Sequence, residues 1–226
     1  MKFLALVKKE FRECLPWICL AGIVFTVVGV FLVDVQVRMD QWSRQRPSET
    51  APGILISYSP LQSVGAILLV VALNLGITMG IRQFLPPSFD KTWSLTLHKP
   101  VHPWTIVTSK FLAASLGLVV SMGLPWALMF LYAVSPGRFL KPVLPTIFWE
   151  GCLMIALGFV AYLGAAVSAM RPVRWYTTRI FGAAFGVGVC ILCVMGTPLA
   201  HAWVLAVIGA CVLAAQVLNA VCSGEI

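Results

Sequence analysis

The sequence predicts an all-α integral membrane protein with six transmembrane helices. Of the 226 residues, 60% are hydrophobic and 11% are charged, whereas about a quarter are charged in an ordinary soluble domain. A spanning helix needs about 20 mainly apolar residues, because the hydrocarbon core is about 30 Å thick. The chain contains six such runs, at approximately 15–33, 61–81, 111–134, 147–169, 180–197 and 201–222. The runs lack the alternation of barrel strands, so helices are expected to satisfy their backbone amides in lipid. We treat 1–226 as a single transmembrane domain.

Residues 1–14 precede the first predicted span and have the pattern of an interfacial helix. Phe3, Leu4, Val7 and Phe11 share one helical face, and charged residues occupy the others. Such a helix lies in the plane of the inner leaflet. Pro16 follows at the start of the span, where a missing amide hydrogen costs little. We therefore expect the chain to bend there, from lying on the membrane to crossing it.

The distribution of basic residues predicts the orientation. With the N-terminus inside, eleven of the sixteen Lys and Arg residues fall in inner segments and five in outer ones. Cytoplasmic loops carry this excess, so both termini are expected in the cytoplasm, beneath a bacterial inner or plasma membrane. The net charge of +8 is spread over short loops next to the membrane, which indicates contact with anionic lipid headgroups and not nucleic acid.

The connections between the predicted spans are marked by prolines. Residues 34–60 are expected to form a long outer loop, either a solvated connector or a lid or partner contact. Pro86 and Pro87 are expected to break or kink the helix of the second span near the inner face. Pro125 is expected to interrupt the third span.

The predicted spans contain almost no charged residues. Ion-coupled transporters commonly carry an intramembrane carboxylate or histidine, so this composition argues against transport driven by protons or sodium. The chain also has no Gly-x-x-x-x-Gly-Lys-[Ser/Thr] phosphate loop. Asn74 and Thr78 in the second span are mild polar groups that either line a pathway or hydrogen-bond between helices.

Three further patterns in the sequence resemble sites. Gly76 with Gly80, and Gly182 with Gly186, permit close approach of a second helix, from this chain or from a partner. Cys190 and Cys193 are interpreted as small packing residues one helical turn apart. His98 and His102 are separated by Pro100 and lack an accompanying glutamate, so no metal site is predicted. No nucleophile stands beside a base, so no catalytic residue is assigned.

The segment 82–110 is the predicted site of function. It is a polar, basic and proline-broken stretch between two apolar runs, and its expected place on the inner side suits contact with soluble machinery. It contains Asp90-Lys91-Thr92, then Pro100-Val101-His102-Pro103-Trp104, then Ile106-Val107-Thr108-Ser109-Lys110.

In order and spacing these residues resemble the coupling segment of ATP-binding-cassette (ABC) transporter permeases of the type 2 exporter class. In that family an acidic residue opens a short cytoplasmic coupling helix, a proline-containing turn follows, and a lysine marks entry into the third span. Lys8-Lys9-Glu10-Phe11-Arg12-Glu13 likewise resembles the family's N-terminal elbow helix. The specific resemblance covers roughly residues 1–135.

The resemblance implies a permease subunit that pairs with a second permease, identical or different, above two cytoplasmic ATPase subunits. This chain would bind no cofactor, because ATP and magnesium belong to the partner ATPase. A hydrophobic or amphiphilic substrate would pass by the second span, with Asn74 and Thr78 as pathway residues. Trp93 or Leu97 would serve as a docking anchor. The full set of residues expected at the ATPase contact is Asp90, Lys91, Thr92, Trp93, Leu97, His98, Pro100, Val101, His102, Trp104 and Lys110.

Two other functions fit the same composition. The chain would then be a non-transporting assembly or sensory membrane protein whose inner loops hold a soluble partner. A third interpretation is an autonomous carrier or channel, which would give flux through membranes containing this chain alone.

Overall fold

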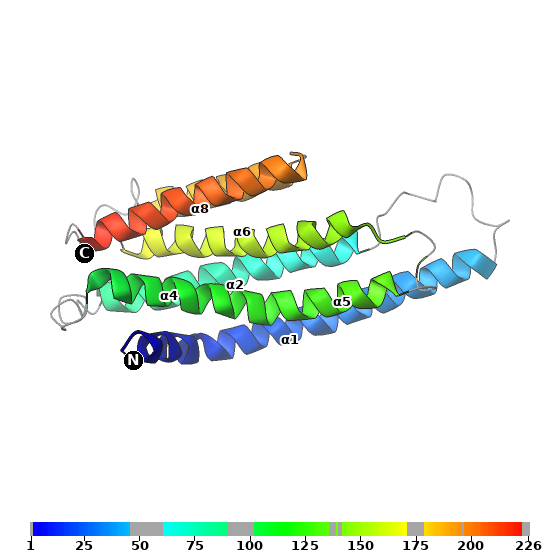
Figure 1. Cartoon of the computed structure of the whole chain (residues 1–226), viewed down its shortest axis with the longest axis horizontal. Helices are drawn as coiled ribbons and strands as arrows, with labels where there is room; N and C mark the ends of the chain where they lie inside the picture. Colours follow the sequence, from blue (N-terminus) through cyan, green and yellow to red (C-terminus); the bar gives the residue numbers. More distant parts are fainter. Residues whose placement is uncertain are drawn as a thin grey trace.

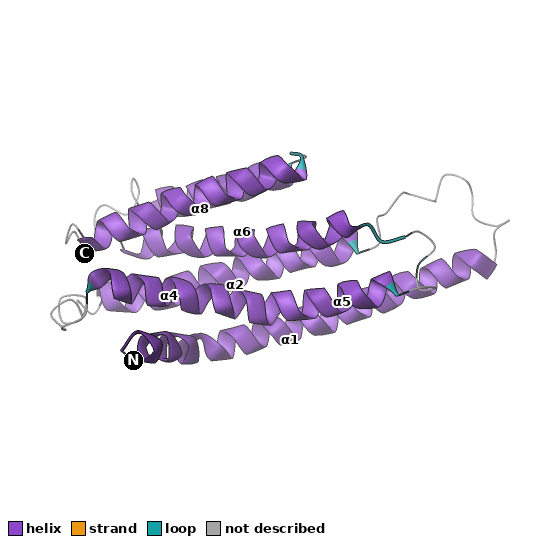
Figure 2. Ribbon diagram, viewed as in Figure 1, coloured by secondary structure: helices purple, strands orange, loops and turns teal. Residues whose placement is uncertain are grey.

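The computed structural model describes residues 2–45, 61–89, 102–135, 139, 142–170, 179–195 and 197–222. The regular elements in these ranges are helices, which run along a common direction (Figures 1 and 2). They are α1 (Lys2–Gln45), α2 (Gln62–Phe89), α4 (Pro103–Leu118), α5 (Leu124–Val134), α6 (Pro145–Met170), α7 (Arg179–Val194) and α8 (Leu199–Cys222). The all-helical prediction is confirmed for the described residues.

Within the described residues, five helical stretches are long and apolar enough to cross a membrane. They are α1, α2, α4 continued by α5, α6 and α8. The run predicted as a span at 180–197 corresponds to α7, an apolar helix of 16 residues. At 1.5 Å per residue, α7 is about 24 Å long, which is shorter than a hydrocarbon core of about 30 Å. Six spans were predicted, and in the part of the chain that the structure describes five helical stretches have the length and composition of a span.

Helix α1 differs from the predicted division into an interfacial helix at 1–14, a span at 15–33 and a loop at 34–60. The helix is continuous from Lys2 to Gln45, with Pro16 inside it. Figure 1 shows its first turns at an angle to the remainder. Beyond residue 33, Arg38 Nε lies 2.8 Å from Asp34 Oδ2, a pairing of residues four apart that supports a helix. Residues 34–45 are thus helical. The prediction that a loop starts at residue 34 is wrong.

The prolines of α2 do not break the helix. Helix α2 continues through Pro86 and Pro87 to Phe89. These prolines lack the amide hydrogens that would bond to the carbonyls of Arg82 and Gln83. The two prolines therefore leave these carbonyl groups without their ordinary partners inside the helix.

The third predicted span is interrupted just before Pro125, where a π-helical turn at Val119–Gly123 separates α4 from α5. The Leu124 amide donates to the Val119 carbonyl, five residues back. Pro125 cannot donate to the Ser121 carbonyl, so the ordinary α-helical bond is missing at this point. The local change of hydrogen-bond register lets α4 and α5 continue as one apolar stretch.

Helix α6 lies at the centre of the packing. It packs against α2, α7 and α8, while α1 packs against α2 and α4. It is also the most deeply buried of the long apolar helices. The start of α1, the end of α2, the start of α4 and the end of α8 lie at the same end of the bundle (Figure 1).

Glycines allow α2 and α7 to approach α6. A Cβ atom on Gly80 would lie 2.6 Å from the Tyr162 carbonyl oxygen, and one on Gly76 would collide with the Gly158 carbonyl. On the other side of α6, a Cβ atom on Gly182 would lie 2.9 Å from the Gly164 carbonyl oxygen. Small residues let helices approach closely where the surrounding lipid supplies no hydrophobic drive. Both glycine pairs therefore pack against α6 of the same chain.

Candidate functional site

A buried ion pair joins α1 to α4 where α4 begins. Lys110 Nζ lies 3.0 Å from both carboxylate oxygens of Glu10, although the two residues are 100 positions apart. Their side chains are 8% and 9% exposed. The same ammonium group donates a hydrogen bond of 3.0 Å to the carbonyl oxygen of Gln83 on α2. Lysine has three N–H donors, so one ammonium group can make several such contacts at once.

Gln83 extends this contact to two more side chains. Its Nε2 amide donates to Cys14 Sγ at 3.3 Å, and its Oε1 accepts from the Tyr162 hydroxyl at 2.6 Å. Gln83 and Tyr162 are buried on α2 and α6. Together the five side chains connect α1, α2, α4 and α6. We call this group the polar network; its members are Glu10, Cys14, Gln83, Lys110 and Tyr162.

Aromatic rings enclose the polar network. Lys110 Nζ lies 5.4 Å from the centroid of the Phe84 ring, within cation–π range. The Tyr162 ring lies 5.6 Å from Phe159 and 6.2 Å from Phe111 and from Phe84. Rings at these separations attract one another and keep water away. The hydrogen bonds of the polar network therefore act in surroundings of low polarity, where they are stronger than in water.

Sequence patterns marked Lys110 and Glu10 separately and did not indicate their contact. Glu10 lies three residues after Val7 and four before Cys14, and all three are buried. That stripe, continued by Ile18, is the face that α1 turns toward the bundle. A carboxylate on an otherwise apolar helical stripe is a detectable signal for a buried partner. Gln83 and Tyr162 carried no such signal, because single polar residues in spans commonly pack without a charged partner.

Most residues of the predicted docking set lie outside the described residues: Asp90, Lys91, Thr92, Trp93, Leu97, His98, Pro100 and Val101. Three members are described. His102 is exposed and precedes α4, and its carbonyl accepts from the Thr105 amide at 2.9 Å. Trp104 is 46% exposed in the first turn of α4. Lys110 faces inward in the polar network, so its ammonium group is not part of an exposed surface.

Asn74 and Thr78 bond to their own helix. Asn74 Nδ2 donates to the Val70 carbonyl at 2.8 Å, and Thr78 Oγ1 donates to the Asn74 carbonyl at 2.8 Å. Asn74 lies near the middle of α2 and is exposed on the outside of the bundle. Neither side chain donates to another helix in these bonds. The bonds therefore do not support the interpretation that Asn74 and Thr78 hydrogen-bond between helices.

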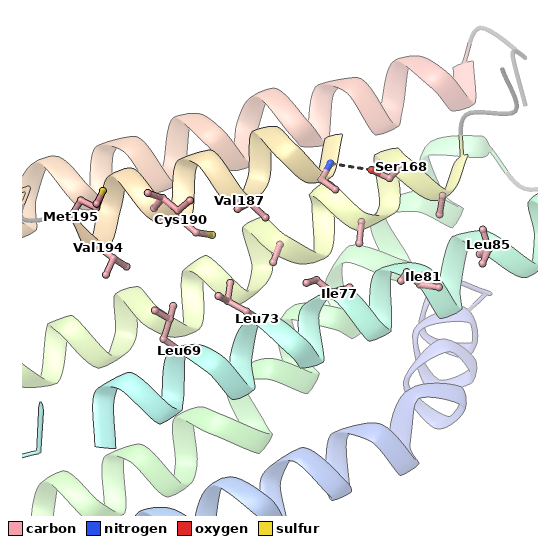
Figure 3. A pocket seen from close by; sticks show the side chains of 15 residues that line it. Leu69, Leu73, Ile77, Ile81, Leu85, Ser168, Val187, Cys190, Val194 and Met195 are labelled. Atoms are coloured by element: carbon pink, nitrogen blue, oxygen red, sulfur yellow. Dashed lines mark hydrogen bonds between the residues drawn. The ribbon is translucent and has the colours of Figure 1, made fainter. Parts of the chain in front are cut away.

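An apolar groove of about 520 Å³ lies between α2, α6 and α7. Figure 3 shows Leu69, Leu73, Ile77, Ile81 and Leu85 along one wall, opposite Val187, Cys190 and Val194. Ser168 contributes a hydroxyl that accepts from the Ala183 amide and donates to the Gly164 carbonyl, both at 3.0 Å. With that hydroxyl already paired, the groove presents a hydrocarbon surface.

Cys190 and Cys193 behave as packing residues. Both are buried, and their sulfur atoms lie 3.8 Å from the Leu157 carbonyl and 3.4 Å from the Ala202 carbonyl. Across the described ranges, His, Cys, Asp and Glu side chains form no group of three that could hold a metal ion.

Comparisons with family models, with curated proteins and with solved structures found no match to this chain. Fold and site together define an all-helical protein whose long apolar helices are compatible with a multi-pass membrane protein.

Proposed function

We propose that this chain is the membrane-spanning permease subunit of an ABC exporter. It would move a hydrophobic or amphiphilic substrate with energy from ATP hydrolysed by a separate ATPase subunit. The observation that carries the proposal is the order of residues from Asp90 to Lys110: an acidic opening, a proline turn and a lysine at the entry to the next span. The absence of a phosphate loop from the sequence is consistent with ATP hydrolysis in a partner.

The position of the polar network supports this proposal. The segment expected to dock the ATPase lies between the end of α2 and the start of α4 in the sequence. Gln83 and Lys110, near those two helix ends, are tied to each other and to α1 and α6. A force applied to that segment would thus reach four helices through short, buried contacts.

The exposed amide of Asn74 supports a pathway on the outer face of α2. One N–H of this amide is paired with the Val70 carbonyl, and a side-chain amide in the hydrocarbon core is stabilised further by a polar partner or water. Asn74 is exposed near the middle of α2, so a second permease subunit beside this face would enclose it. Asn74 and Thr78 would then lie between two subunits, where a substrate with polar groups could contact them.

Docking can be tested by co-expressing the tagged chain with any phosphate-loop ATPase that is encoded beside its gene. The amount of ATPase recovered and its ATP hydrolysis in lipid nanodiscs would be measured. We expect both to fall strongly when Trp93, Leu97 and Trp104 are replaced together by alanine, because buried aromatic anchors carry much of an interface's affinity.

A matched control removes the same residue types elsewhere. Trp42, Leu128 and Trp149 are 53%, 66% and 56% exposed on other parts of the bundle. Their triple alanine variant should retain both the ATPase and its activity. Full complex formation by the Trp93, Leu97 and Trp104 variant would refute the docking assignment. Recovery of no ATPase with the unmodified chain would favour the non-transporting assembly or sensory protein, and flux through liposomes with this chain alone would favour a carrier or channel.

A further inference from the structure

We propose that the polar network is a mechanical joint: it makes α1 and α6 follow displacements of the end of α2 and the start of α4. Glu10, Gln83, Lys110 and Tyr162 are the positioning residues of this joint. The inference rests on the proposed function, because it concerns how the docking segment acts on the bundle. Beyond the proposed function, the inference names the residues that transmit the movement and the helices that move.

The joint depends on a carbonyl group that α2 leaves unpaired. In an α-helix the carbonyl of Gln83 would accept from the amide of residue 87. That residue is Pro87, which has no amide hydrogen. The Gln83 carbonyl accepts instead from Lys110 Nζ, at 3.0 Å. The proline that was expected to break α2 therefore frees an acceptor for a contact with α4.

Burial distinguishes this ion pair from the exposed pairs of α1. Lys9 with Glu13 and Asp34 with Arg38 each join residues four apart on one helix, and their side chains are more than half exposed. Such pairs contribute little and cannot couple two helices. The contact of Glu10 with Lys110 bridges α1 and α4, with both oxygens at 3.0 Å from one nitrogen. Movement of α4 relative to α1 would leave two opposite charges unpaired in apolar surroundings.

Stability alone does not account for such a pair. Replacing a buried ion pair by apolar residues of similar volume is often neutral or stabilising, whereas removing one partner is strongly destabilising. The network nevertheless uses a charged pair, an amide and a phenol to fix α1, α2, α4 and α6 in one arrangement. Directional contacts of this kind define relative position more narrowly than apolar packing does. We therefore infer that the network serves to fix the positions of these four helices relative to one another.

The test replaces the ion pair without leaving a lone charge. In the variant carrying Glu10→Met and Lys110→Met, side-chain volume is roughly kept. Lys9→Met with Glu13→Met removes an exposed pair from the same helix and is the matched control. Tyr162→Phe removes a single hydroxyl from the network and serves if the first variant does not fold. Each would be prepared with Cys19, Cys152, Cys211 and Cys222 replaced by alanine.

The first measurement uses the chain alone in nanodiscs. Nitroxide labels at the exposed positions Arg12 on α1 and Thr108 on α4 report the distance between these helices. We expect a narrow distribution in the unmodified chain and in the control, and a broader one in the Glu10→Met, Lys110→Met variant. An unchanged distribution in that variant, and in Tyr162→Phe, would overturn the joint whether or not the chain binds an ATPase.

The second measurement uses the complex with the co-expressed ATPase, trapped with ATP and vanadate. Labels at Ala215 on α8 and at either Arg12 or Thr108 report how α1 and α4 move relative to α8. Both distances should shift in the unmodified chain. In the Glu10→Met, Lys110→Met variant we expect the α4 shift to remain and the α1 shift to be lost. Retention of both shifts would overturn the joint, and no ATPase in the complex would count against the proposed function alone.

Discussion

At the scale of single residues, Lys110 shows how a position marked by sequence acquires a different physical role in the fold. Its place at the head of an apolar run suggested a charge near the membrane surface. The structure turns the side chain inward, where it pairs with the Glu10 carboxylate and donates a hydrogen bond to the Gln83 carbonyl. A buried ammonium group needs such partners, because burial without them costs several kcal/mol.

Removing only one member of the ion pair should be more harmful than removing both. Lys110→Met leaves the Glu10 carboxylate buried without its partner, and we expect a loss of about 3–5 kcal/mol in unfolding free energy. The double variant Glu10→Met, Lys110→Met should lose less, about 1–3 kcal/mol, because only the Gln83 carbonyl is left without its donor. Thermal or denaturant unfolding in detergent micelles would measure the difference. Equal stability of the single and double variants would show that the two charges do not depend on each other.

At the scale of elements, the contact between α2 and α6 depends on glycine. Gly76 and Gly80 sit against the backbone of α6, close to Gly158 and Tyr162. Tyr162 also belongs to the polar network, so this glycine contact helps to set the position of its hydroxyl beside Gln83. Close packing and the polar network are therefore properties of the same pair of helices.

Adding one methyl group at this contact should separate the helices. In Gly80→Ala the new Cβ would lie 2.6 Å from the Tyr162 carbonyl oxygen and 2.9 Å from Ala165 Cβ. We expect a loss of about 1–3 kcal/mol in unfolding free energy, the usual cost of overpacking. Gly65→Ala on the same helix is the control, because nothing lies within 4 Å of its added Cβ. This control should be neutral or more stable by up to about 1 kcal/mol, since alanine favours helix.

At the scale of the whole molecule, the bundle brings the start of α1, the end of α2, the start of α4 and the end of α8 to one end (Figure 1). The polar network lies at helix positions close to that end. The excess of basic residues in the predicted inner segments would place this end in the cytoplasm.

Cysteine accessibility in intact cells tests that orientation. His102 and Ser135 are exposed near opposite ends of the stretch from α4 to α5. In a background without native cysteines, Ser135→Cys should react with a membrane-impermeant maleimide from outside, and His102→Cys only after permeabilisation. Buried Ser109→Cys should remain unlabelled in both conditions. The reverse pattern for His102 and Ser135 would mean that the chain is inserted in the opposite orientation.

Hydropathy in the sequence alone determined that the chain is helical and carries long apolar segments, because segment length and composition are local properties that a bilayer constrains strongly. Local sequence patterns predicted less well where each helix begins, ends or is interrupted. Pro86, Pro87 and Pro125 were expected to disturb their helices; α2 continues through its two prolines, whereas a π-helical turn separates α4 from α5 just before Pro125. Helix α1 also extends to Gln45, beyond the limit that apolarity suggested, because helix formation does not end where hydrophobicity does.

Tertiary structure alone decided which polar and small residues meet. Glu10 and Lys110 are 100 residues apart, and Gln83 and Tyr162 are 79 apart. Their pairing depends on the packing order of α1, α2, α4 and α6, which no local pattern encodes. The glycines of α2 and α7 were recognised as contact surfaces, but only the fold identified α6 as their partner. Contacts between distant positions arise from the arrangement of whole helices, and the polar network is one of these contacts.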